Sequence, residues 1–215
     1  MFLTNKSLNF LAELAANNDR GWFNDNKSRY ESDVKKPFIE LISKLIDELG
    51  EPITYKESIF RINRDTRFSP DKTPYKTHLS AVVSRFGTKN KAYPGLYIHL
   101  DAEKLMIGGG AYFLEKIPLL NVRNAIMNDH ENFKSIINNK NFIAHFDGLH
   151  ESEKNKVLPS EMKDFLKIEP LIANKQFFVM KNYPSERVLQ NDIVEFMVAH
   201  SKALNPLNQF LRDCF

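Results

Sequence analysis

Cationic side chains are concentrated in one stretch of the chain, Phe60–His78, which reads FRINRDTRFSPDKTPYKTH. Its positive residues are Arg61, Arg64, Arg67, Lys72 and Lys76. A guanidinium group is a planar fork of donors that matches phosphate or carboxylate at two points, and a lysine adds a point charge. Because prolines stiffen this stretch, the pattern predicts an ordered loop whose cations bind an anionic ligand.

Acidic and titratable residues in the same stretch extend the prediction to catalysis. A phosphate-processing enzyme needs a carboxylate for a metal ion or a water molecule in addition to its cations. Asp65 and Asp71 are the candidates for a general base or a metal ligand, and His78 is the candidate for proton transfer. The reaction that these residue types fit best is phosphoester hydrolysis or transfer. We assign no metal site, and the sequence indicates no particular cofactor.

Two other interpretations of the stretch stay open. In the first, the arginines pair with Asp65 and Asp71 and only brace the loop. In the second, the loop is a non-catalytic interaction module that docks on an acidic protein or a nucleic acid, with Phe68 and Tyr75 stacking on bases.

The distribution of charge favours a small ligand. The formal net charge of the chain is +3, and residues 56–78 alone hold six cations and three anions, so the remainder is neutral. A positive field confined to one place suits a compact anionic molecule better than a long nucleic-acid track.

Two further features could carry chemistry. Backbone amides of Gly108-Gly109-Gly110 could receive an anion, but the triplet matches neither common phosphate-loop pattern, and close approach of another backbone explains it as well. Cys214 is the only cysteine, which excludes a disulfide within the chain and fits a reducing compartment.

Hydrophobic spacing and turn residues predict the elements around the basic stretch. One helix is capped by Ser7, one is kinked or restarted by Pro37 and stops at Gly50, and a last helix is capped by Ser185 and breaks at Pro206. Strands are expected at 58–63, 79–86, 96–100, 105–107, 142–146 and 176–180, and further helices at 118–126 and 131–137.

These elements indicate an α+β fold in which an antiparallel β-meander packs against N-terminal and C-terminal helices. We expect a single domain, 1–215, made of a helical part at 1–50, the sheet with its basic loop at 58–112, and a mixed helical part at 113–215. Met1–Ser7 lacks a basic region followed by an apolar run, and no stretch approaches the roughly 18 apolar residues of a membrane span. A cytoplasmic protein is therefore expected, in an oligomeric state that the sequence leaves open.

Two long motifs resemble the domain of unknown function 2461. They are Asn17-Asn18-x-Arg20-x-Trp22-Phe23-x-x-Asn26-Lys27-x-x-Tyr30-Glu31 and Arg61-Ile62-Asn63-Arg64-Asp65-x-Arg67-Phe68-x-x-Asp71-Lys72-x-Pro74-Tyr75-Lys76, followed by the glycine triplet. The resemblance covers nearly the whole chain and implies no particular activity, substrate or cofactor. Arg20 and Arg123 match the family pattern too, so each could reach the same pocket or bridge helices to the sheet. Gly21 and Leu114 depart from it, standing where glutamate and proline are usual.

Overall fold

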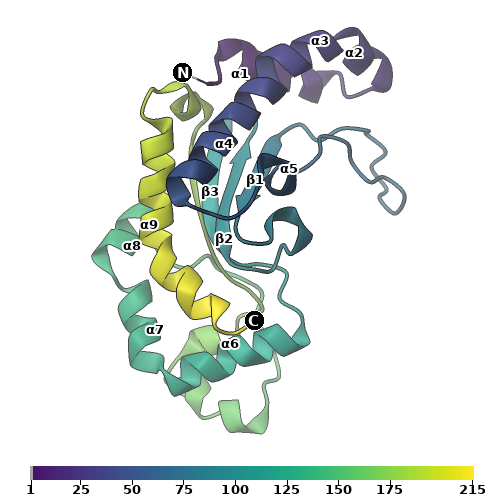
Figure 1. Ribbon diagram of the computed structural model, residues 1–215. Coiled ribbons are helices and arrows are strands. Elements are labelled where there is room, and N and C mark those ends of the chain that lie inside the picture. The colour runs from purple at the N-terminus through teal and green to yellow at the C-terminus, as the bar shows by residue number, and fades with distance from the viewer. Residues whose placement is uncertain (1) are drawn as a thin grey trace. The chain divides into compact units, whose positions relative to one another are not determined.

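The computed structural model describes residues 2–215 (Figure 1). The chain divides into two compact units, each built from several segments. Unit 1 comprises Met1–Lys89, Tyr97–Ile107 and Asn182–Ala199, and unit 2 comprises Asn90–Leu96, Gly108–Lys181 and His200–Phe215. The single-domain organisation expected from the sequence stays a prediction.

A four-stranded antiparallel sheet confirms the predicted α+β class. Its strands are β1 (Leu79–Val83), β2 (Gly95–Leu100), β3 (Lys104–Ala111) and β4 (Phe177–Pro184), which pair in that order. Strands adjacent in sequence are therefore adjacent in the sheet, as in a meander. In β2, Leu96, Ile98 and Leu100 are buried while Tyr97 and His99 are partly exposed, which is the two-residue period of a strand with one covered face.

Helices come before the sheet in unit 1, and α4 lies against β1. They are α1 (Asn5–Ala16), α2 (Arg20–Asp25), α3 (Lys27–Arg29), a π-helix (Tyr30–Lys35), α4 (Lys36–Leu49) and α5 (Tyr55–Ser58). Gly50 ends α4 in the left-handed conformation at φ 64°, as predicted. The predicted cap of α1 is wrong by one turn, because Thr4 is the N-cap and the Ser7 hydroxyl accepts its N–H at 3.0 Å.

Pro37 changes the helix that contains it without ending it. Proline has no N–H, so the carbonyl of Asp33, one turn earlier, lacks its usual helical donor. The Ser7 hydroxyl donates to that carbonyl at 2.5 Å instead. The turn just before the proline is the π-helix, closed by the N–H of Lys36 donating to the carbonyl of Glu31. The predicted kink is thus a local widening of the helix.

The strand predicted at 58–63 is wrong. Thr54 and Glu57 form a capping box that starts α5, so Ser58 is helical. Beyond it the chain is extended but pairs only at single positions, Ile59 with Ala81 and Asn63 with Tyr75. The capping pair, rather than the alternation of residues after it, determines how this segment begins.

The glycine triplet lies inside β3, so this strand continues beyond the predicted range 105–107. A Cβ on Gly109 would stand 2.2 Å from the carbonyl oxygen of Gly95 and 2.3 Å from Cδ2 of Leu204. Gly110 has a φ of 96°, which side chains rarely allow. Close approach of neighbouring chain segments is therefore the reason for glycine here.

The remaining helices agree with the predictions only in part. They are α6 (Lys116–Asn128), α7 (His130–Ile137), α8 (Lys140–Phe146) and α9 (Ile193–Arg212), with short 3₁₀ helices at Gly87–Lys89, Ser160–Met162, Phe165–Lys167, Pro170–Ala173 and Ser185–Leu189. The strand predicted at 142–146 is wrong, because the Asn139 side chain caps a helix there. Ser185 begins a 3₁₀ turn rather than the last helix, and Pro206 lies inside α9.

Within residues 2–215, no helix combines the length and the apolar character that crossing a membrane requires.

Candidate functional site

The basic stretch forms a long loop that extends from unit 1 on a paired stem (Figure 1). In the stem, the N–H of Arg64 donates to the carbonyl of Pro74 at 2.9 Å, and the N–H of Lys76 donates to the carbonyl of Ile62 at 2.8 Å. The loop proper, residues 65–73, contains no helix or strand. Its charged side chains form hydrogen bonds with other residues of the same loop.

A side-chain amide ties this stem to the helices. Asn18 donates from Nδ2 to the carbonyl of Tyr75 at 2.9 Å, and its Oδ1 accepts the N–H of Tyr75 at 3.1 Å. The Tyr75 ring stacks on Phe23 of α2, with centroids 4.0 Å apart. These contacts hold the start of α2, whose first residue is Arg20, beside the stem of the loop.

A hollow of about 620 Å³ lies at this junction, and we call it the loop hollow. The lining residues used below are Asn18, Asp19, Arg20, Arg64, Lys72 and Thr73. Three of them are cations and one, Asp19, is an anion. Asp19 is engaged in capping α2, where its carboxylate accepts the N–H of Trp22 at 2.9 Å.

The three cations keep unused donors. Arg64 contacts Asp71 and the Thr73 hydroxyl through Nη1 alone, so its Nε and Nη2 have no partner among residues 2–215. Lys72 donates to the carbonyl of Thr66 at 2.9 Å, which leaves two of its N–H groups. Arg20 lines the same hollow and has no hydrogen bond or ion pair within the described chain.

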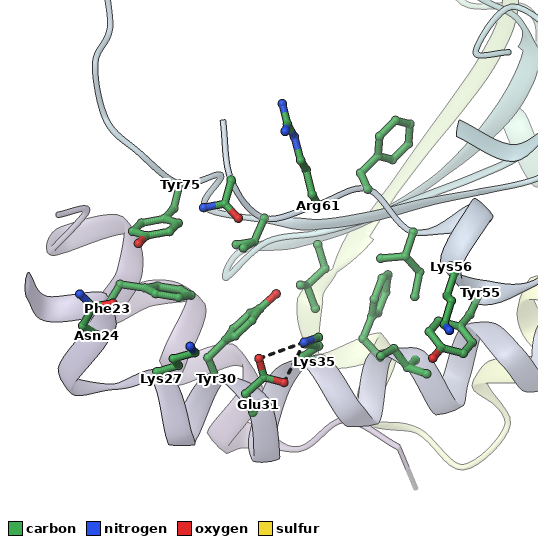
Figure 2. A pocket seen from close by; sticks show the side chains of 17 residues that line it. Phe23, Asn24, Lys27, Tyr30, Glu31, Lys35, Tyr55, Lys56, Arg61 and Tyr75 are labelled. Atoms are coloured by element: carbon green, nitrogen blue, oxygen red, sulfur yellow. Dashed lines mark hydrogen bonds and ion pairs between the residues drawn. The ribbon is translucent and has the colours of Figure 1, made fainter. Parts of the chain in front are cut away.

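The other predicted cations lie elsewhere. Arg67 is 76% exposed and forms two hydrogen bonds with Asp65, from Nε at 2.9 Å and Nη2 at 2.7 Å, so it is a brace of the loop. Lys76 lies over the ring of Phe60, 5.1 Å from its centroid. Arg61 lines a second cleft next to α2–α4, and Figure 2 shows its guanidinium directed away from those helices. Of the five predicted cations, the loop hollow contains Arg64 and Lys72.

The two predicted carboxylates are held as anions. Hydrogen bonds from the Arg67 side chain and backbone lower the pKa of Asp65 to about 2. The N–H of Thr73 and then the Arg64 side chain lower the pKa of Asp71 to about 2. A carboxylate with so low a pKa is a weak proton acceptor at neutral pH. Their roles as catalytic groups stay predictions.

His78 belongs to a separate cluster of unit 1. Its ring stacks on His99 with centroids 4.1 Å apart, and Nε2 of His99 lies 3.2 Å from Asp101. Burial, and then the charge of His99, lowers the pKa of His78 to about 4. His78 does not line the loop hollow, so the three predicted catalytic residues do not converge there.

Arg123, the other arginine of the family pattern, is a structural residue of unit 2. It is 4% exposed and donates to the carbonyls of Ile172, Ala173 and Asn174 at 2.8, 3.5 and 3.2 Å. Arg20 is therefore the one of the pair that reaches the basic loop, and only the motif pointed to it. Among residues 2–215, no three His, Cys, Asp or Glu side chains are arranged to hold a metal ion.

The fold and the site define an α+β protein whose antiparallel sheet is preceded by a basic loop with a cation-lined hollow. Residues 6–210 match the family described as "Conserved hypothetical protein (DUF2461)", and the chain belongs to this family. The resemblance expected from the motifs is thus confirmed over nearly the whole chain. Comparison with curated proteins finds no match.

Proposed function

We propose that the loop hollow binds a compact anionic group, such as the phosphate of a phosphorylated small molecule. The observation that carries the proposal is the position of Arg20, a cation without a partner, beside Arg64 and Lys72. Three cations face one carboxylate in the lining, and each cation has donors to spare. An arginine and a lysine together offer both two-point and point-charge contacts to phosphate oxygens.

The contacts of Arg64 support binding further. Asp71 and the Thr73 hydroxyl hold one edge of its guanidinium, and the remaining nitrogens stay free. A side chain already held in place loses less conformational entropy when a ligand arrives. Asp71 thus orients Arg64 and leaves part of its donors for a ligand.

Binding is better supported than phosphoester hydrolysis or transfer. Asp65 and Asp71 each pair with an arginine and have a pKa of about 2, and His78 lies outside the hollow. We therefore propose that the protein binds anions in the cytoplasm. Catalysis of phosphoester hydrolysis or transfer by these three residues is a second, less supported part of the proposal.

A thermal-shift experiment tests binding. The probe is inorganic phosphate, compared with sodium chloride at the same ionic strength. When phosphate is in roughly 100-fold excess over its Kd, we expect Tm to rise by several degrees. Lys72→Gln should reduce this rise, whereas Lys163→Gln, which removes an exposed lysine of unit 2, should not. No rise in the unmodified protein, or equal loss in both variants, would overturn the proposal.

A non-catalytic interaction module is the second candidate. Its specific support is Phe68, which is 93% exposed in the loop with the Arg67 guanidinium 5.7 Å from its ring centroid. An exposed aromatic ring beside a cation can stack on a nucleic-acid base. Fluorescence anisotropy with a labelled single-stranded oligonucleotide separates the candidates. Saturable binding that falls steeply between 50 and 200 mM salt, as counterion release requires, and that is lost in Phe68→Ala would favour this module.

A further inference from the structure

A second cleft, of about 530 Å³, lies in unit 1 between the helices α2–α4 and the extended segment after α5 (Figure 2). We call it the helix cleft. Its aromatic lining on the helix side comes from Phe23, Tyr30 and Phe38, and apolar side chains of Ile59 and Ile62 line it from the extended segment. Its volume falls within the roughly 300–1,000 Å³ range of small-molecule sites.

Tyr30 provides a polar group on the apolar lining. The residue is 8% exposed, and its hydroxyl makes no hydrogen bond with any residue from 2 to 215. Figure 2 shows this hydroxyl directed from the helix toward the extended segment, into the cleft. Burial, and then the charge of Glu31, raises the pKa of Tyr30 to about 12. At neutral pH the phenol is therefore neutral and keeps its O–H as a donor.

The helix is irregular where it lines the cleft. Tyr30, Glu31 and Lys35 all belong to the π-helix Tyr30–Lys35 and all line the cleft. A π-helix is a rare geometry that recurs at functional sites. The bond from Ser7 to the Asp33 carbonyl stabilises this turn from outside the cleft.

The charges around the helix cleft are unbalanced. Lys35 is neutralised by Glu31, with nitrogen and oxygen 2.9 Å apart. Lys27 on α3 and Lys56 on α5 also line the cleft, and neither has an ion pair within residues 2–215. Arg61 directs its guanidinium away, so it does not contribute a donor inside. Two exposed lysines at an apolar cleft attract a molecule that carries negative charge.

We propose that the helix cleft binds a small amphipathic acid, meaning a flat apolar body that carries one anionic group. The body would lie against Phe23 and Tyr30, as aromatic side chains favour flat apolar partners. The anionic group would accept the Tyr30 O–H and be neutralised by Lys27 or Lys56. The helix cleft and the loop hollow are both lined by Asn63 and Tyr75, but their cations are different residues. The site proposed here therefore does not depend on the function proposed above.

Two dyes of matched shape test the proposal. 8-Anilinonaphthalene-1-sulfonate carries an anionic group, and N-phenyl-1-naphthylamine has the same ring systems without it. We expect the first dye to bind saturably at one site and about tenfold more tightly than the second. Fluorescence titration against the native, full-length chain gives both constants, and melting curves confirm that each variant is folded.

Substitutions locate the binding. The double variant Lys27→Gln/Lys56→Gln and the single variant Tyr30→Phe should each weaken the anionic dye by about tenfold and leave the neutral dye unaffected. The control Lys140→Gln removes an exposed lysine of unit 2 and should change neither constant. Equal affinity for the two dyes, or an effect of the control as large as that of the cleft variants, would overturn the proposal. Phosphate stabilisation in the double variant should persist, which separates this site from the loop hollow.

Discussion

Arg20, Arg64 and Arg67 show how neighbouring acids determine what an arginine can do. Asp65 stands two residues before Arg67 and occupies its Nε and Nη2, so this guanidinium has little left for a ligand. Asp71 reaches Arg64 only at Nη1. Arg20 has no ion pair within residues 2–215. The three arginines thus differ in how many of their donors are occupied, from Arg67 with the most to Arg20 with none. Arg20 is therefore the most informative position in the loop hollow to substitute.

His78 predicts how stability depends on pH. Its pKa is lowered from 6.5 to about 4 by burial and then by His99, whose own pKa burial also lowers. As the pH falls below about 6.5, the unfolded chain binds a proton that the folded chain refuses. Stability is therefore lost between about pH 6.5 and pH 4 and changes no further from this group below that range.

The variant His78→Gln tests this dependence, because it removes the titrating ring. The fall of Tm between pH 6.5 and pH 4.5 should be smaller in this variant than in the unmodified protein. His150→Gln, at an exposed histidine of unit 2, serves as the control and should retain the full decrease. An identical decrease in all three proteins would show that the fold does not lower the pKa of His78.

At the scale of elements, the π-helix depends on α1. Ser7 donates to the Asp33 carbonyl because Pro37 cannot. We predict that Ser7→Ala lowers the free energy of unfolding by about 1–3 kcal/mol, the cost of leaving a buried polar group unpaired. Urea denaturation measures the change. Ser28→Ala, at an exposed position of α3, should have little effect.

A second substitution separates this hydrogen bond from other roles of Ser7. In Pro37→Ala the backbone regains an N–H that can donate to the Asp33 carbonyl. The cost of Ser7→Ala should therefore be smaller in the Pro37→Ala background than in the unmodified protein. Additive effects of the two substitutions would mean that Ser7 acts only through its contact with Thr4.

The glycines of β3 give a prediction about packing. Gly109→Ala would force its Cβ to within 2.2 Å of a backbone oxygen and 2.3 Å of Leu204, both in unit 2. Crowding of this kind costs about 1–3 kcal/mol or more. Gly50→Ala meets open space at φ 64° and should cost only about 1–2 kcal/mol, the penalty of a left-handed residue. Urea denaturation compares the two, and a smaller loss at Gly109 would contradict the observed packing.

At the scale of the whole molecule, the sequence predicted the elements with a long, regular pattern. Alternation in β2 and the helical spacing that ends at Gly50 were correct. The segments 58–63 and 142–146 were not, because a run of five or six residues fits a strand or a helix equally well. The capping box at Thr54 begins the short helix that includes Ser58, and the Asn139 cap begins the helix that covers 142–146.

The sequence was enough to locate the candidate site, but it did not predict which side chains would come together there. The density of cations marked the loop, and the motif marked Arg20. The conformation of the loop determines which cations pair with Asp65 and Asp71. Residue spacing alone does not predict that conformation. The helix cleft left even less trace, because its lining combines the π-helix with the segment after α5, both of which local patterns misjudge.

Calorimetric titration with inorganic pyrophosphate tests the central claim, that the basic loop binds anions through the hollow it shares with Arg20. We predict that Arg20→Gln weakens binding by about tenfold, the loss of one charge-assisted contact. Arg67→Gln removes the same charge from the same surface, but outside the hollow, and should change Kd by less than about twofold. Equal weakening by both substitutions, or no binding to the unmodified protein, would contradict the account.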